Sequence, residues 1–124
     1  MTTENIGANE TIIIGGNRTE TVQGDATVTV GATRSESVGA DQVITVGANQ
    51  TITVGGDSAV QVGANRSINV GGTALVSGGD QIVLKVGKAS ITLNHDGSIV
   101  IEGTQITIDA SCDVVLKGQK ILQN

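Results

Sequence analysis

The sequence predicts an all-β protein in which short strands alternate with corners around a triangular cross-section. Three observations carry this prediction: glycine recurs every eight residues, Val or Ile precedes most of these glycines, and the 124-residue chain has no Phe, Trp, Tyr or Pro. A globular core usually depends on aromatic bulk. A solenoid of stacked repeats can instead be filled by thin layers of Val, Ile and Leu, and such an internal period is the first feature to identify in a sequence.

The repeating unit is an octad, seen most clearly in residues 46–53, VGANQTIT. Ile52 and Val54 are two residues apart, so on an extended strand their side chains point to the same side. Thr51 and Thr53 point to the other side. The Gly-Ala-Asn sequence that begins the octad is typical of a turn, because Gly supplies φ freedom and Asn bonds to nearby backbone. Each octad is therefore predicted to be one strand and one corner.

Applied along the chain, this pattern predicts which side chains point inward and which residues form corners. The predicted inward-facing residues are Ile12, Val28, Val30, Ile44, Val46, Ile52, Val54, Val60, Val62, Ile68, Val70, Ile82, Leu84, Val86, Ile91, Leu93, Ile99, Ile101, Ile106, Ile108, Val114 and Leu116. The predicted corners are Gly7, Gly15, Gly31, Gly39, Gly47, Gly55, Gly63, Gly71, Gly79 and Gly87.

The length of the octad limits how the strands can assemble. Eight extended residues trace at most about 26 Å. A triangle closed by a single octad would have sides of about 9 Å, whereas facing sheets need about 10 Å between them for their side chains. One octad therefore forms one side of the triangle. Either one chain coils with three octads per turn, or three chains wind together and each supplies one side, and the period alone leaves both open.

Two octads carry a charge at the inward position. Glu20 and Glu36 stand where Val or Ile stands in the other octads, and Arg18 and Arg34 precede them by two residues on the same strand face. One interpretation is a charge-compensated layer near a hydrated corner. The other is a ring of carboxylates around a cation. An ion on the axis is compatible with the sequence, but nothing indicates one, and we predict no cofactor.

The period changes in the last third of the chain. Gly78 replaces the usual Val and leaves less inward volume, which suggests a change of cross-section within residues 71–88. From Ala89 the Val-Gly signature ends, while apolar pairs two residues apart continue. We therefore divide the chain into an octad-repeat β-helix, residues 1–88, and a C-terminal continuation of the β-helix toward the tip, residues 89–124.

Charge and composition argue against several functional classes. A formal net charge of −5 disfavours electrostatic binding to nucleic acid or anionic membrane. The single cysteine, Cys112, rules out an intrachain disulfide framework. The sequence contains no secretory signal and no apolar run of transmembrane length, so we expect synthesis in the cytoplasm.

The sequence offers little for catalysis. His95 is the only histidine and lies in a predicted turn, Asn-His-Asp-Gly, and Cys112 has no histidine placed as a base. The period of eight does not fit the nonapeptide of calcium-binding β-rolls. Pairs such as Thr51 and Thr53 resemble the threonine ranks of ice-binding β-solenoids, but Ala59 and Gln61 interrupt the rank. We predict that the chain is not an enzyme.

The octads, together with the stretches ASITL at residues 89–93, DGSI at 96–99, GTQITI at 103–108 and VLKG at 115–118, resemble the C-terminal part of VgrG proteins. These are the valine-glycine repeat spike proteins of bacterial type VI secretion systems, which are similar to the central spike of T-even phage tails. The resemblance covers the chain from about Ile6 to Asn124.

This resemblance implies an intertwined, triple-stranded β-helix formed by a homotrimer. It implies a non-catalytic needle that a contractile machine pushes through a target membrane, exported to the exterior or into a target cell. The tip would bind a PAAR-type cap protein, and secreted effectors would be further partners. A segment of a phage tail spike or fibre is the alternative, and a single-chain ice-binding β-solenoid is a weaker one.

Overall fold

The computed structural model describes residues 2–124, and this part of the chain contains no helix. Accordingly, no helix in it is long and apolar enough to cross a membrane. The chain divides into two units, Met1–Asp57 and Ser58–Asn124, which we describe separately. The prediction of an all-β protein is confirmed in this respect, because the regular elements within residues 2–124 are all β-strands.

Residues 2–80 consist of extended segments separated by bends at intervals of eight residues. The bends lie at 7–8, 15–16, 23–24, 31–32, 39–40, 47–48, 55–56, 63–64, 71–72 and 79–80. Every predicted corner glycine before Gly87 begins one of these bends. The remaining bend, at Gln23 and Gly24, lies at the one place where the octad lacks its first glycine.

The corner glycines from Gly7 to Gly79 do not use a positive φ; within residues 2–124 only Gly87 and Gly97 have one. We expected glycine at every corner because glycine permits a positive φ. The structure shows such a φ at only one predicted corner, Gly87. Along the octads, a Cβ on any corner glycine would have no atom of its own chain within 4 Å. Nothing within a single chain thus accounts for the glycine at these corners.

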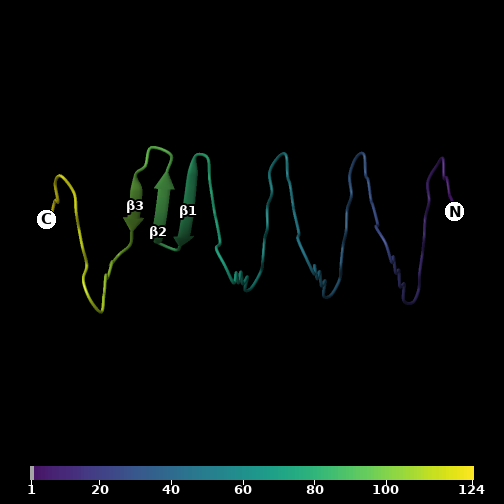
Figure 1. The fold of residues 1–124 in the computed structure, drawn as a ribbon, viewed down its shortest axis with the longest axis horizontal. Helices are drawn as coiled ribbons and strands as arrows, with labels where there is room; N and C mark the ends of the chain where they lie inside the picture. Colours follow the sequence, from purple (N-terminus) through teal and green to yellow (C-terminus); the bar gives the residue numbers. More distant parts are fainter. Residues whose placement is uncertain (1) are drawn as a thin grey trace. The chain divides into compact units, whose positions relative to one another are not determined.

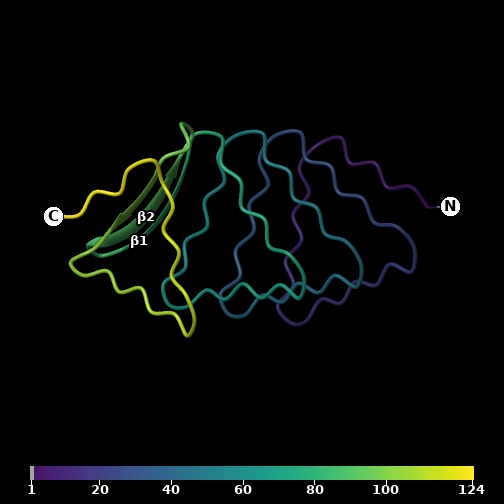
Figure 2. The same cartoon turned by 60° about the vertical axis from the view of Figure 1, so that its left-hand side comes forward.

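The extended segments of residues 2–80 have no strand partners within the chain. Strand pairing in residues 2–124 is confined to 81–102. Within residues 2–57, successive passes of the chain lie apart in Figure 1, and in the turned view of Figure 2 they cross only in projection. Backbone N–H and C=O groups of these octads are therefore left for other partners.

Residues 81–102 form a three-stranded antiparallel sheet in the order β1-β2-β3 (Figure 1). Its strands are β1 (Gln81–Val86), β2 (Ala89–Asn94) and β3 (Ile99–Glu102). The pairing places Leu84 opposite Ile91, and Ile91 opposite Ile101. Ile, Val, Leu and Thr dominate these strands, as expected for residues that pack well on a pleated surface.

In this sheet β2 folds back on β1 and β3 folds back on β2, an arrangement that we did not predict. The division of the chain at residue 88 stays a prediction. Two turns explain the reversal. Gly87, with φ of 54°, and Lys88 join β1 to β2, so Gly87 lies in a hairpin turn. In the second turn, Gly97 has φ of 85° and its N–H donates to the carbonyl of Asn94 at 3.1 Å. A glycine with positive φ is what tight hairpins of these lengths require.

No residue in the described part of the chain is buried. The solvent-accessible surface of the chain is 13386 Å². A compact monomer of 12.4 kDa would expose only about 6,100 Å². The single chain thus exposes more than twice the area expected, and it has no hydrophobic core of its own.

Candidate functional site

The first candidate surface is the row of predicted inward side chains along the octads. These side chains are exposed in the single chain, including Ile52 at 77%, Val54 at 49% and Ile68 at 72%. Exposed aliphatic side chains repeated at this density mark a surface that another molecule covers. The octads therefore present an apolar row together with unpaired backbone groups.

The second candidate surface is one face of the sheet. Residues directly opposite in an antiparallel pair share a face, and the register pairs Ile82 with Leu93, Leu84 with Ile91 and Val86 with Ala89. The same face continues onto β3, where Leu93 pairs with Ile99 and Ile91 with Ile101. The predicted inward residues of the sheet thus share one apolar face, and these are Ile82, Leu84, Val86, Ile91, Leu93, Ile99 and Ile101.

A shallow hollow of about 330 Å³ adjoins this apolar face. Its lining includes Leu84 and Ile91 from the sheet and Gly103 and Ile106 from the segment that follows β3. Apolar side chains form most of the lining, with Lys85, Ser90, Glu102 and Gln105 as its polar residues. The hollow thus extends the apolar face of the sheet onto the segment that follows β3.

The structure pairs both unusual glutamates with the arginines that precede them. The Nη2 atom of Arg18 lies 2.8 Å from Oε2 of Glu20, and Nη2 of Arg34 lies 3.5 Å from Oε2 of Glu36. This pairing fits the charge-compensated interpretation. The cation interpretation stays a hypothesis, and within residues 2–124 no three His, Cys, Asp or Glu side chains are grouped to hold a metal ion.

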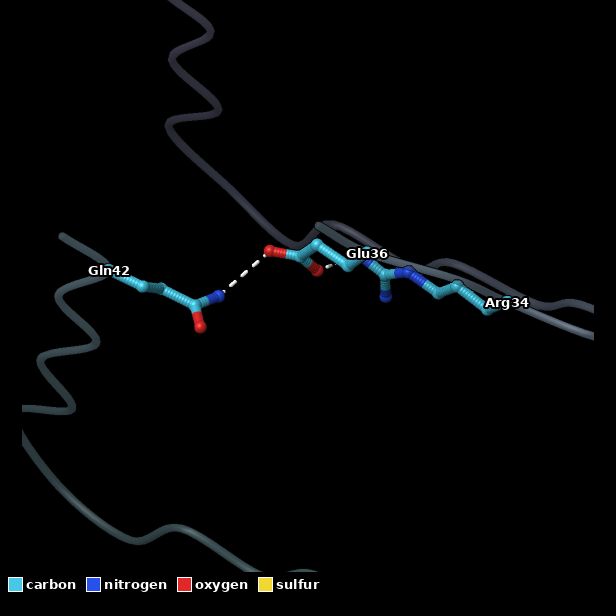
Figure 3. A network of polar contacts seen from close by, with 3 residues as sticks. All are labelled: Arg34, Glu36 and Gln42. Carbon is cyan, nitrogen blue, oxygen red and sulfur yellow. Dashed lines mark hydrogen bonds and ion pairs between the residues drawn. The ribbon is translucent and has the colours of Figure 1, made fainter. Parts of the chain in front are cut away.

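Gln42 is a member of this polar set that the sequence analysis missed. Its Nε2 donates to Oε1 of Glu36 at 2.8 Å, so Glu36 has an arginine on one oxygen and an amide on the other (Figure 3). Gln42 lies in the octad after Glu36 and occupies the position equivalent to Arg34. That equivalence is the signal by which the sequence could have revealed it.

Most other side-chain hydrogen bonds belong to the second hairpin turn; the exception is the hydroxyl of Ser90 in β2, which donates to Oε2 of Glu102 in β3 at 3.4 Å. Asp96 Oδ1 accepts hydrogen bonds from the hydroxyl of Ser98 at 2.7 Å and from its backbone N–H at 2.9 Å. The bond from the hydroxyl makes the largest contribution and the bond from the backbone N–H the second largest. Together they hold the pKa of Asp96 below its ordinary value of 3.8. The amide of Asn94 donates to the same hydroxyl at 3.0 Å and accepts from Gln81 at 2.8 Å. The set therefore stabilises the turn and ties it to β1.

His95 and Cys112 are both exposed. His95 lies in the turn between β2 and β3, and its backbone N–H donates to the carbonyl of Asp80 at 2.9 Å. Cys112 lies at a bend in the segment after the sheet. The structure thus confirms the predicted turn at His95 and places Cys112 at a bend.

The comparison with known families bears on the octads. Residues 2–77, more than half of the chain, match the family described as the bacteriophage T4 gp5 C-terminal trimerisation domain. The chain belongs to this family. A search of curated proteins found no match.

Membership of the gp5 C-terminal trimerisation family shows which assembly the chain forms. The chain self-associates as a homotrimer, so surfaces that are open in one chain are available to two others. The family is related to phage tail spikes, and the chain has a structural role of that kind. The matched region ends at residue 77, one residue before Gly78 and four before β1 begins at Gln81.

Proposed function

We propose that the octads of three chains intertwine into a triple-stranded β-helix, in which each octad forms one side of a shared triangular prism. The observation that carries this proposal is that octads bent every eight residues have no strand partner within their own chain. Extended backbone without ladder hydrogen bonds is costly unless other groups satisfy it. Strands of two other chains would satisfy it along the whole row.

The single-chain alternative makes a different prediction about the same segments. A chain that coiled alone, with three octads per turn, would stack each octad about 4.8 Å from the octad three positions later. Those strands would then form hydrogen-bonded ladders, and residues 2–80 contain none. In a trimer the intervening strands come from the other two chains. This argues against the single-chain ice-binding solenoid, which the irregular threonine rank also disfavours.

We further propose that the prism is the needle of a membrane-puncturing spike in a contractile injection machine of the type VI secretion kind. Three chains that wind around one another cannot separate locally without unwinding, so the assembly resists bending and shear. Outward Thr and Ser side chains keep the surface polar. About ten extended segments per chain in residues 2–80, at about 4.8 Å each, would give a needle of about 50 Å for this part of the chain.

In this proposal the needle carries no catalytic site and no cofactor. Its partners are two further copies of the chain, a PAAR-type cap at the tip and secreted effectors, and the machine exports it to the exterior or into a target cell. The support is the resemblance of residues 89–118 to the VgrG tail, which lies beyond the part of the chain that matches the gp5 family.

A phage tail spike is the second candidate function, and the name of the matched family favours it.

The two candidate functions can be distinguished with chimeric spike proteins. Residues 6–124 would replace the needle of a type VI spike protein in one chimera and that of a phage tail spike in another. We expect the first chimera to restore killing of competitor bacteria. Restoration of plaque formation alone would assign the chain to a phage tail, and failure of both would reject a spike role.

The proposed assembly has a simple test of its own. Light scattering of the purified chain should give the mass of three 12.4-kDa chains, about 37 kDa. The measurement belongs at low concentration and in mild detergent, where nonspecific association of exposed aliphatic side chains is weak. A mass of one chain would contradict the shared prism.

A further inference from the structure

Repeating octads leave the alignment of three chains poorly specified. Val46, Val54, Val62 and Val70 recur every eight residues with nearly the same surroundings. If one chain slipped by one octad, Val would still meet Val before most corner glycines, and from Ile44 to Val76 an Ile or Val would still meet an Ile or Val at the position two residues earlier. Register is weakly specified wherever a slip keeps apolar side chains on the apolar face. Some feature of the chain must therefore distinguish one alignment from the others.

Two polar groups interrupt the apolar row at positions that can do this. The first is Arg18 with Glu20, and the second is Arg34 with Glu36 and Gln42. Their charged side chains are more than half exposed in the single chain, at 60% for Arg18, 66% for Glu20, 63% for Arg34 and 54% for Glu36. The two glutamates occupy a position that holds Ile or Val in the other octads, whereas the position of the arginines and of Gln42 is polar in most octads.

We propose that these two groups, the register layers, fix the alignment of the three chains. The inference rests on the proposed prism, since it requires the octads of three chains to meet around one axis. With the chains in register, three copies of each group lie at one level. A carboxylate can accept about four hydrogen bonds, and each glutamate receives only one or two within its own chain. Donors from the neighbouring copies supply the rest.

A slip removes this arrangement. A slip of one octad places Glu20 of one chain level with Ile12 or Val28 of another. Charged groups are then surrounded by aliphatic side chains, where a buried charge is strongly unfavourable without further partners. A slip of two octads aligns Glu20 with Glu36, but it places the other Glu36 level with Ile52. No slip within the octads therefore satisfies both layers.

A single buried polar position that fixes register and oligomer state is well attested in coiled coils. The same logic applies to any bundle whose apolar repeat is shorter than the chain. The stability of the trimer and the uniqueness of its alignment can then be changed independently. Aliphatic side chains in place of the register layers would preserve or raise the stability of the trimer while allowing more than one alignment of its chains. This separation is what the experiment measures.

The experiment uses pulsed electron spin resonance on the full chain. A spin label at Thr53→Cys, on the outward side, in a Cys112→Ser background reports the distances between the three copies. The test variant is R18Q/E20I/R34Q/E36I. It replaces both charged pairs with the Gln and Ile that stand at positions 50 and 52 of the uncharged octad. A slip of one octad would move a label along the axis by about 4.8 Å, so the distance distribution should split in the test variant and remain single in the parent.

Two further variants serve as controls. R18Q/E20I retains the second layer and is expected to keep the single distance. R66Q removes an arginine from the equivalent octad position, but Arg66 precedes Ile68 and has no glutamate to pair with. It should therefore behave as the parent in both mass and distance distribution.

The outcomes are distinguishable. A trimeric test variant with the single distance of the parent would overturn the register inference and leave the proposed prism intact. The test variant could also fail to assemble while R18Q/E20I forms a normal trimer. This result would mean that the register layers stabilise the trimer without selecting one alignment of the chains, and it would also overturn the register inference. A monomeric parent would overturn the prism and this inference together.

Discussion

Gly78 lies so close to Gln81 that a side chain at position 78 would collide with backbone. A Cβ built on Gly78 would stand 2.9 Å from the carbonyl oxygen of Gln81 and 2.9 Å from Cγ1 of Ile82. Gly78 is the one place in residues 70–86 where the octad pattern calls for Val and has Gly instead. Glycine at this position marks the point where the octads without strand partners end, three residues before β1 begins at Gln81.

Replacing Gly78 with Ala should therefore destabilise the protein by about 1–3 kcal/mol, because backbone cannot move aside cheaply. Gly79→Ala is the matched control, since nothing of the chain lies within 4 Å of its Cβ position, and its effect should stay within about 0.5 kcal/mol. Thermal unfolding at one fixed protein concentration compares the two, because assembly makes the midpoint concentration-dependent. Equal midpoints would contradict the close approach.

The direction of side chains along the octads predicts a second contrast. Ile52→Asp should abolish assembly or destabilise it by at least about 3 kcal/mol, because it places three carboxylates on the axis. Thr53→Asp places them in water and should change stability by less than about 0.5 kcal/mol. Circular dichroism melting with light scattering would measure both, and similar behaviour of the two variants would reverse the inward and outward assignment.

The first hairpin turn predicts a third contrast. Gly87 has φ of 54°, a conformation that costs other L-residues about 1–2 kcal/mol. Gly87→Val should lower stability by that amount, whereas Gly87→Asn should lower it less because Asn tolerates positive φ. Chemical denaturation of both variants checks this. A Val variant as stable as the parent would show that the turn adopts another conformation in the assembled protein.

The second hairpin turn predicts a dependence on pH. The hydroxyl and backbone N–H of Ser98 bind the ionised form of Asp96 and hold its pKa below 3.8. The turn is therefore fully stabilised above about pH 4, and this contribution is lost as the pH falls through the lowered pKa of Asp96. Carboxyl chemical shifts from nuclear magnetic resonance would follow the titration. In Ser98→Ala the pKa should rise toward its ordinary value, and an unchanged pKa would exclude the hydroxyl as its main cause.

The sequence predicted the octads well because their signal is strictly local. Gly at the start of each octad and apolar side chains two residues apart in most octads are enough to place the bends and to define a row of side chains such as Ile52 and Val54. No distant contact alters them. The trimer could not be derived this way, because the period fits one chain or three, and it was the absence of strand pairing in residues 2–80 together with the family match that distinguished them.

The antiparallel sheet was the part that sequence reasoning missed. Ile91 and Leu93 look the same whether β2 stacks above β1 or folds back against it, since both arrangements keep the two side chains on one face. The decisive residues were Gly87 and Gly97, whose positive φ reverses the chain. The antiparallel register nevertheless brings Ile82, Leu84, Ile91 and Leu93 to the same face. That this face points inward stays a prediction.

The central claim is that the octads pair between chains, and amide hydrogen exchange of the assembled protein tests it most directly. The sheet residues 81–94 are an internal reference, because their ladder lies within one chain. We predict that the extended segments of residues 2–77 exchange as slowly as this reference, with faster exchange only at the bends. Rapid exchange throughout residues 2–77, beside a protected sheet, would contradict the account.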